Sequence, residues 1–362
     1  NKAAIRAARG NIATPPQGRG PRGGKTVAHD AGGLPNTFTR LLVRNAELYG
    51  SRPAMRHKDL GIWQSWTWAQ TLDIVRAYAA GLHRLGLKRG DTIAIVGANR
   101  PKLYRSVMAA QMIGAIPVPV YADAVADELR YVLAHAEVRF AAVEDQEQVD
   151  KIQSVLDHLP KLERMIYDEA RGLRDYDHSS LNAIDDVIAD GRKALAAEPE
   201  LRQWLDAEIA AGKGSDPSII LYTSGTTGVS KGVVLTNERS IAAAADTVAF
   251  DHLDETDVAL AYLPLAWVGD HYLNYAQGMV AAFCTACPEN AETAMASLIA
   301  QLLDDPEPAA AHRIGCRGSQ PGRLGRAVLD LDADVVVGLD DDLERRPGVQ
   351  HSVGGQLAEG DD

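Results

Sequence analysis

The stretch that decides the fold reads Ser218-Ile-Ile-Leu-Tyr-Thr-Ser-Gly-Thr-Thr-Gly-Val-Ser-Lys231-Gly232. Its first five residues form an apolar run without polar alternation, which predicts a strand covered on both faces in a parallel sheet. The hydroxyls, glycines and single cation that follow would then lie at the carboxyl end of that strand. Because ligands collect at this edge of open α/β sheets, the stretch predicts a binding loop.

The loop has the composition of a phosphate cradle. Its glycines permit positive φ, so successive backbone N–H groups can turn toward one anion. The lysine adds a compact positive charge, and the hydroxyls add donors. The alternative is a surface turn that binds nothing, but such a turn needs neither this many hydroxyls nor a terminal lysine. The candidate phosphate ligands are Thr223, Ser224, Gly225, Thr226, Thr227, Gly228 and Lys231.

The spacing of the loop does not fit a Walker A motif, in which the lysine follows Gly and precedes Ser or Thr. Here Ser230 precedes Lys231, and Gly232 follows it. The next residues are β-branched and apolar, so they predict a second strand and not a phosphate-capping helix. These features argue against an unrelated NTPase that hydrolyses its nucleotide to ADP.

Three stretches together resemble the AMP-forming acyl-CoA synthetases of the adenylate-forming superfamily, and are most similar to long-chain fatty acid–CoA ligases. The loop resembles the family's phosphate loop. Gly114-Ala-Ile-Pro-Val-Pro-Val-Tyr121 resembles its G-A-x-x-V-P-x-Y segment, and Leu263-Pro-Leu-Ala-Trp267 resembles its L-P-L-A-x segment. Each alone is a weak match, but all three occur in the family's order.

The resemblance implies a two-step reaction. A carboxylate attacks the α-phosphorus of ATP to give acyl-AMP and pyrophosphate, and the thiolate of coenzyme A then displaces AMP. The loop would hold the β- and γ-phosphates with the help of Mg²⁺, and no residue need become a covalent nucleophile. Long-chain fatty acids are the implied substrates. Medium-chain or aromatic acids, and a carrier protein as the acceptor, stay open.

The resemblance also places the Leu-Pro-Leu segment near the carboxylate substrate. Trp267 and His271 are therefore candidates for the wall of an acyl pocket. Many relatives carry His at the position of Trp267, so this chain departs from the family there. The structural alternative makes Trp267 a core residue and His271 a hydrogen-bonded helix residue.

The family's later segments are not visible in the sequence. They comprise the Y-G-x-T-E segment, the T-G-D segment whose Asp holds the ribose, and a small C-terminal domain with the catalytic Lys. Without them the adenosine lacks its usual partners, and no catalytic residue can be assigned. The alternative function is a catalytically inactive nucleotide-binding fragment or remnant.

Composition and charge fit a large α/β enzyme. The 362 residues can bury a core, and the net charge of −12 argues against nucleic acid or anionic membranes as general partners. Three cysteines form no disulfide framework and favour a cytoplasmic location. Cys284-Thr-Ala-Cys287 lacks the second pair of a zinc site, so we expect no protein-held metal. No apolar run reaches the ~20 residues of a membrane helix, so membrane contact would be peripheral.

Three segments differ in composition. Residues 1–33 are basic and rich in Gly and Pro, which predicts a disordered tail. Such a start can mimic a transit peptide, but a fragment end or readthrough from upstream sequence is the preferred interpretation. Their formal G-x-G-x-x-G lacks the strand that a dinucleotide site needs before it. Residues 34–302 predict a partial AMP-binding domain. Residues 303–362 contain no Phe, Tyr or Trp, and we expect an aberrant tail that is not native to the fold, for example from a shifted reading frame.

Within residues 34–302 the apolar periodicity alternates between strand and helix. From Asp91 to Tyr167 the order βαβαβ predicts a parallel sheet with right-handed crossovers. Residues 168–216 predict a solvent-facing helical excursion, and Asn237 is expected to cap the helix after the loop. The expected fold is α/β: the large N-terminal domain of adenylate-forming enzymes, with stacked, mostly parallel sheets flanked by helices, incomplete at the C-terminus.

Overall fold

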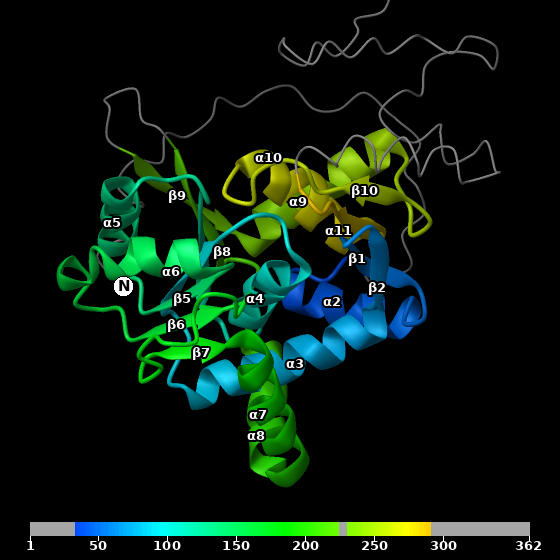
Figure 1. Ribbon diagram of the computed structural model, residues 1–362. Coiled ribbons are helices and arrows are strands. Elements are labelled where there is room, and N and C mark those ends of the chain that lie inside the picture. Colours follow the sequence, from blue (N-terminus) through cyan, green and yellow to red (C-terminus); the bar gives the residue numbers. More distant parts are fainter. Residues whose placement is uncertain (1–32, 224–229, 291–362) are drawn as a thin grey trace, which may run out of the picture. The chain divides into compact units, whose positions relative to one another are not determined.

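The computed structural model describes residues 33–223 and 230–290 (Figure 1). A five-stranded sheet, the central sheet, has the strand order β4-β3-β5-β6-β7, and all its pairs are parallel, as predicted. Its strands are β3 (Thr92–Val96), β4 (Ile116–Val120), β5 (Phe140–Val143), β6 (Arg164–Tyr167) and β7 (Leu181–Ala183). The short β7 was not predicted from the sequence.

The central strands are buried because helices cover both faces of the sheet. Ile93 and Ile95 of β3 belong to the core under one face, whereas Ala94 and Val96 belong to the core under the other. This alternation follows from the two-residue period of a strand. The helices on the first face are α3 (Trp68–Arg84), α4 (Pro101–Met112) and α7 (Ile184–Ala197), and those on the second are α5 (Ala126–His135) and α6 (Gln146–Gln153) (Figure 1).

The two prolines of β4 are compatible with its place at the end of the central sheet's strand order. The backbone N–H of Ile116 donates to the carbonyl of Asp91 on the β3 side at 2.8 Å. Pro117 and Pro119 alternate with Ile116, so their nitrogens face away from β3. A proline, which has no N–H to donate, is tolerated at such edge positions.

Helix α3 begins with a complete capping box. The Thr67 hydroxyl accepts from the backbone N–H of Gln70 at 3.2 Å, and the Gln70 side chain accepts from the N–H of Thr67 at 2.9 Å. Trp68 is 2% exposed and donates its indole N–H to the carbonyl of Ala282 at 3.0 Å. Thr67 therefore caps α3, and Trp68 is a core residue.

The segment 168–216 is only partly the solvent-facing excursion that its charge predicted. It contains β7, α7 and α8 (Pro199–Ala211). Helix α7 packs tightly on α3, because Gly191 of α7 and Gly81 of α3 lack side chains where the two backbones meet. A Cβ atom at Gly191 would lie 1.9 Å from the carbonyl oxygen of Ala77. The sequence did not reveal this interface, since small residues carry a weak burial signal.

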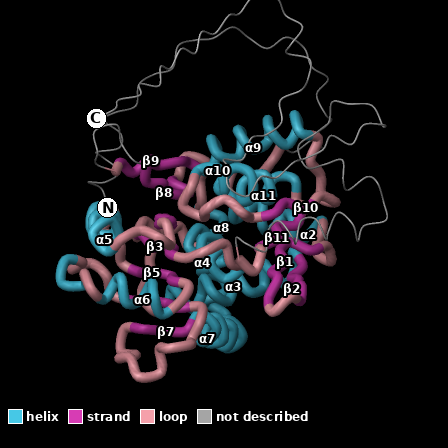
Figure 2. The backbone as a smooth tube through the Cα atoms, turned by 45° about the horizontal axis from the view of Figure 1, so that its top comes forward, coloured by secondary structure: helices cyan, strands magenta, loops and turns pink. Residues whose placement is uncertain are grey.

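A second sheet joins distant parts of the chain and has the strand order β10-β11-β1-β2 (Figure 2). Strand β1 pairs in parallel with β11 and antiparallel with β2. Its strands are β1 (Pro53–Asp59), β2 (Ile62–Thr67), β10 (Val258–Leu260) and β11 (Cys284–Cys287). The two β11 cysteines are buried free thiols, and burial raises the pKa of Cys284 to about 11. They are packed in a strand, as expected for incidental thiols.

The loop strand is buried as predicted, but its partner is not a parallel strand. Strand β8 (Pro217–Thr223) pairs antiparallel with β9 (Lys231–Thr236) in a separate two-stranded sheet. The reason is connectivity: a short loop lets consecutive strands form a hairpin, whereas a parallel pair needs a crossover of a dozen or more residues. The prediction of a parallel sheet at this point is wrong, and the predicted second strand after the lysine is confirmed.

The remaining helices pack beside the second sheet. They are α2 (Phe38–Leu48), α9 (Asn237–Asp251), α10 (Val268–Asp270), the π-helix η2 (His271–Ala276) and α11 (Gln277–Ala281); a short 3₁₀ helix η1 (Leu156–His158) follows α6. Asn237 does not cap α9. Its side-chain oxygen accepts from the N–H of Phe38 at 3.1 Å and its amide donates to the carbonyl of Asp216 at 3.1 Å, so it ties α9 to α2.

No helix in residues 33–223 and 230–290 is both long and apolar enough to cross a membrane. The predicted tails, 1–33 and 303–362, lie outside the described residues apart from Gly33.

Candidate active site

The hairpin of β8 and β9 brings together the two ends of the predicted phosphate loop. Thr223 and Lys231 are partners in the last pair of the ladder, and both side chains are exposed. We call Tyr222, Thr223, Ser230 and Lys231 the loop base. The predicted ligands Ser224, Gly225, Thr226, Thr227 and Gly228 lie outside the described residues.

Helix α5 contacts the loop base on both of its strands. The Tyr131 hydroxyl donates to the backbone carbonyl of Ser230 at 2.9 Å. Nδ1 of His135 lies 2.7 Å from the Tyr222 hydroxyl in a hydrogen bond. Burial raises the pKa of Tyr222, so its hydroxyl stays protonated. Sequence reasoning missed Tyr131 and His135; the available signal was two rings at i and i+4 on one predicted helix.

Trp267 and His271 lie on the same helical segment but in different surroundings. Trp267 is 46% exposed at the start of α10, so the structure does not place it in a core formed by the described residues. His271 is 2% exposed. Its ring stacks on Tyr275 at 5.6 Å and meets Phe38 edge-on at 5.9 Å.

The burial of His271 keeps its ring neutral. Desolvation lowers the pKa of His271 to about 4. Its Nε2 atom has no hydrogen-bond partner among the described residues. A buried ring packed among aromatic side chains fits the structural alternative better than the surface of an open pocket. The hydrogen bond which that alternative also expected is not seen at Nε2.

Asp270, beside His271, is the centre of a buried polar network. Its Oδ1 accepts from the side-chain amides of Asn99 at 3.0 Å and Asn274 at 2.7 Å, and from the Tyr104 hydroxyl at 2.7 Å. The Asn99 amide also donates to the carbonyl of Leu263 at 2.7 Å. The network therefore ties the Leu-Pro-Leu segment to the residues after β3. Sequence reasoning assigned no role to Asp270.

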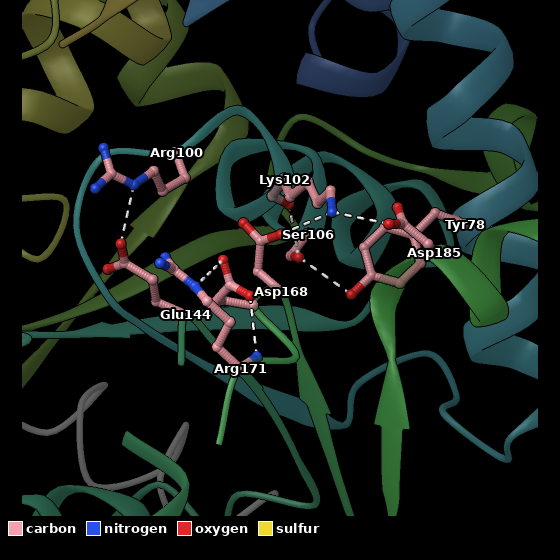
Figure 3. Close-up of polar contacts among 9 residues, drawn as sticks. Tyr78, Arg100, Lys102, Ser106, Glu144, Asp168, Arg171 and Asp185 are labelled. Atoms are coloured by element: carbon pink, nitrogen blue, oxygen red, sulfur yellow. Dashed lines mark hydrogen bonds and ion pairs between the residues drawn. The ribbon is translucent and has the colours of Figure 1, made fainter. Parts of the chain in front are cut away.

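The carboxyl edge of the central sheet holds ion pairs (Figure 3). The order β4-β3-β5-β6-β7 places the topological switch point, where open α/β sheets usually bind ligands, between β3 and β5. Glu144 lies there: one of its oxygens accepts from the N–H of Ala98 at 2.6 Å and the other from Arg100 Nε at 2.9 Å. A side chain of the protein thus takes the place at which an anionic ligand would bind.

A second cluster lies farther along the same edge. Lys102 Nζ lies 2.8 Å from Asp168 and 3.0 Å from Asp185 (Figure 3). Burial acts to lower the pKa of Lys102, but the two carboxylates outweigh it and raise that pKa. The one lysine is outnumbered by the two aspartates, so this cluster is net negative and repels phosphate. The hairpin is therefore the better candidate for a polyphosphate.

Comparison with known proteins settles the family. A family model described as AMP-binding enzyme matches residues 42–310. This chain belongs to the AMP-binding enzyme family. The resemblance seen in the sequence is therefore confirmed.

Two curated relatives of this AMP-binding chain are both named long-chain-fatty-acid–CoA ligases. Human long-chain-fatty-acid–CoA ligase ACSBG2 is 28% identical over 235 residues, which cover 65% of this chain and 34% of the relative. Long-chain-fatty-acid–CoA ligase FadD15 of Mycobacterium bovis is 30% identical over 210 residues, which cover 58% of this chain and 33% of the relative. The chain spans about a third of the length of these relatives.

The fold of this AMP-binding chain is also that of solved adenylate-forming enzymes. The anthranilate CoA ligase AuaEII in complex with anthranoyl-AMP matches with a TM-score of 0.62 at 20% identity, over 74% of this chain and 48% of that one. At this level of identity the likeness is one of fold. It confirms the predicted fold class.

Proposed function

We propose that this chain is part of an acid–thiol ligase that uses ATP to convert a long-chain fatty acid to acyl-AMP and then to acyl-CoA. The observation that carries the proposal is the hairpin, in which a loop of the family's sequence joins β8 and β9 with Thr223 and Lys231 paired at its base. The names of the curated relatives support the substrate class.

In this proposal the loop binds the β- and γ-phosphates of ATP. Lys231 contributes its positive charge, so that charge developing on pyrophosphate is stabilised as the carboxylate attacks the α-phosphorus. The described residues contain no group of His, Cys, Asp and Glu that could hold a metal ion. A Mg²⁺ ion bound mainly by the phosphates fits this better than a protein-built cage. The proposed loop ligands are Thr223, Ser224, Gly225, Thr226, Thr227, Gly228 and Lys231.

The acyl pocket is proposed beside the Leu-Pro-Leu segment. Trp267, Val268 and Leu273 expose 46%, 40% and 47% of their surface there, which offers apolar contact to an acyl chain. His271 lies behind them and supports the helix through its ring contacts. Coenzyme A is the proposed acceptor, because the curated relatives are named CoA ligases.

The remaining parts of the proposal concern boundaries and location. Residues 34–302 are proposed as the partial AMP-binding domain, supported by the family match over 42–310. A reducing, cytoplasmic location is supported by Cys284 and Cys287, which are free thiols. With a fatty substrate, contact with membranes would be peripheral.

Exchange of labelled pyrophosphate into ATP, with a long-chain fatty acid and Mg²⁺, tests the function. Exchange by the wild-type chain would support the ligase, and Lys231→Ala should then lose about 10- to 100-fold, because a charge-assisted contact to phosphate is removed. Lys193→Ala, at an exposed lysine of α7, is the matched control and should keep full exchange.

Other outcomes separate the alternatives. ATP binding without exchange would support the inactive nucleotide-binding fragment. Formation of ADP would support an unrelated hydrolase. Full exchange in a variant that combines Lys231→Ala with alanine at Thr226 and Thr227 would overturn the assignment of the loop.

A further inference from the structure

The loop base depends on contacts outside its own hairpin. A two-stranded sheet is at best marginally stable by itself, and the ladder of β8 and β9 ends at Thr223 and Lys231. Thr223 and Lys231 are the last pair of this ladder in the part of the chain that the structure describes. Groups that contact both strands here therefore help to fix the positions of Thr223 and Lys231.

Helix α5 supplies such groups from one face. Tyr131 and His135 are four residues apart, so their rings lie on the same side of the helix. The two rings stack, with centroids 5.5 Å apart and an interplanar angle of 21°. Tyr131 bonds the β9 side of the loop base at Ser230, and His135 bonds the β8 side at Tyr222.

The third ring completes the contact. Tyr222 meets His135 edge-on, with centroids 5.8 Å apart and an interplanar angle of 88°. The hydroxyl of Tyr222 and Nδ1 of His135 are thus held both by the hydrogen bond and by ring packing. Helix α5 bonds the β8 strand through the Tyr222 side chain and the β9 side through the backbone carbonyl of Ser230. A shift of either strand would therefore break a hydrogen bond.

Helix α5 is itself fixed to the central sheet. Leu129, Val132 and Leu133 are buried in the core under the second face of that sheet. Helix α5 therefore holds the loop base at a fixed place relative to the central sheet. Preorganised donors are effective because they need not be ordered during the reaction.

We propose that Tyr131 and His135, with Tyr222, are positioning residues that fix the loop base, and with it the phosphate ligands Thr223 and Lys231. This inference rests on the proposed function, since it assumes that the loop binds the polyphosphate of ATP. None of the three residues needs to touch ATP. Their effect would reach the nucleotide through the loop base.

Tyr131→Phe, His135→Phe and Tyr222→Phe test the proposal, because each removes a hydrogen bond and keeps an aromatic ring. We expect each to raise the KM for ATP in pyrophosphate exchange about two- to tenfold, the size of one neutral hydrogen bond, and to leave the KM for the fatty acid unchanged. Because His135 and Tyr222 share one bond, their double variant should lose no more than either single variant.

Tyr176→Phe is the matched control. Tyr176 also bonds two side chains, Gln146 at 2.8 Å and Asp150 at 2.6 Å, but these belong to α6. Thermal unfolding of all variants separates positioning from stability. The proposal is overturned if the three variants lose as much stability as Tyr176→Phe and have the same KM for ATP as Tyr176→Phe. Their role is then structural only.

Failure of the proposed function gives a different result. If wild type and Tyr176→Phe both lack exchange, the ligase assignment fails, and calorimetric titration with ATP then tests the positioning role directly. Weaker ATP binding in Tyr131→Phe and His135→Phe than in Tyr176→Phe would support it. Equal binding, or no binding by the wild type, would overturn it.

Discussion

Asp270 and Tyr104 are joined by a hydrogen bond in the interior: the Tyr104 hydroxyl lies 2.7 Å and 2.8 Å from the two carboxylate oxygens. Burial raises the pKa of Asp270 to about 6, although its bonds to Tyr104 and two asparagines act against this rise. The next residue, His271, is shifted in the other direction, because burial lowers its pKa to about 4. Sequence neighbours therefore make opposing contributions to stability below neutral pH.

Asp270→Asn should reveal the contribution of His271. As pH falls from about 6 to about 4, the folded protein protonates Asp270 before the unfolded chain does, which raises the free energy of unfolding. Over a similar pH range the unfolded chain protonates His271 before the folded protein does, which lowers the free energy of unfolding. Each contribution amounts to at most about 3 kcal/mol. With Asn at 270 only the destabilising contribution of His271 remains. The free energy of unfolding should therefore decrease more steeply than in wild type as the pH is lowered.

Urea unfolding at several pH values between about 4.5 and 7.5 measures this effect. His271→Gln is the companion variant, because it removes the titrating ring and leaves Asp270. It should make the free energy of unfolding rise, relative to wild type, as the pH falls. The same pH dependence in wild type and both variants would contradict the opposing shifts.

Arg105→Met should stabilise the protein. Arg105 is 4% exposed, and its Nε and Nη2 atoms have no hydrogen-bond partner among the described residues. Burial lowers its pKa to about 10, and the guanidinium lies 4.4 Å from the centroid of the Trp66 ring. Met keeps an apolar contact with Trp66 and removes the buried charge. We expect a gain of about 1–2 kcal/mol in the free energy of unfolding, measured with urea.

Arg171→Met is the control for this substitution. Its side chain is 88% exposed and pairs with Glu169 at the surface, so the free energy of unfolding should change by less than about 0.5 kcal/mol. A clear loss of stability in Arg105→Met would mean that the contact with Trp66 outweighs the cost of burying the charge.

Gly191→Ala should destabilise the interface of α3 and α7. The new Cβ would lie 1.9 Å from the carbonyl oxygen of Ala77 and 2.6 Å from the nitrogen of Gly81, so the helices must separate. We expect a loss of about 1–3 kcal/mol, despite the better helix propensity of Ala. Gly212→Ala is the control, because its nearest neighbours would be 3.6 Å away. Equal thermal unfolding of the two variants would refute the close packing.

Trp267→Ala tests the acyl pocket. If the indole contacts the acyl chain, kcat/KM for a long-chain acid should fall by about tenfold, the size of a few lost methylene contacts, while the KM for ATP stays the same. Phe250→Ala, at a residue of α9 that is 83% exposed, provides the control. Unchanged kcat/KM in Trp267→Ala would remove Trp267 from the pocket.

Sequence alone predicted the elements that local pattern determines. The apolar runs of β3 and β4 depend only on residues close in the chain. The family followed from the spacing of the loop and two flanking segments. Even the strand after Lys231 was predicted from its β-branched residues.

Long-range pairing accounts for what the sequence did not reveal. The antiparallel partner of β8 was missed because the apolar run of a buried strand does not identify its neighbour. The bonds of Asp270 to Asn99 and of His135 to Tyr222 join residues far apart in the chain. Of the predicted ligands, the structure places Thr223 and Lys231 together, while Trp267 and His271 differ in exposure. No local pattern encodes such differences.

The parallel pairing of β1 with β11 has a consequence for biosynthesis. Met55 lies opposite Thr285, so β1 emerges from the ribosome long before its partner is translated. Until then only the antiparallel contact with β2 is available to it. Closing so large a loop is entropically costly and slow. Until β11 is in place, the unpaired edge of β1 can pair with other chains. Nascent chains should therefore need a chaperone at this edge more than at the central sheet, whose strands are translated in close succession.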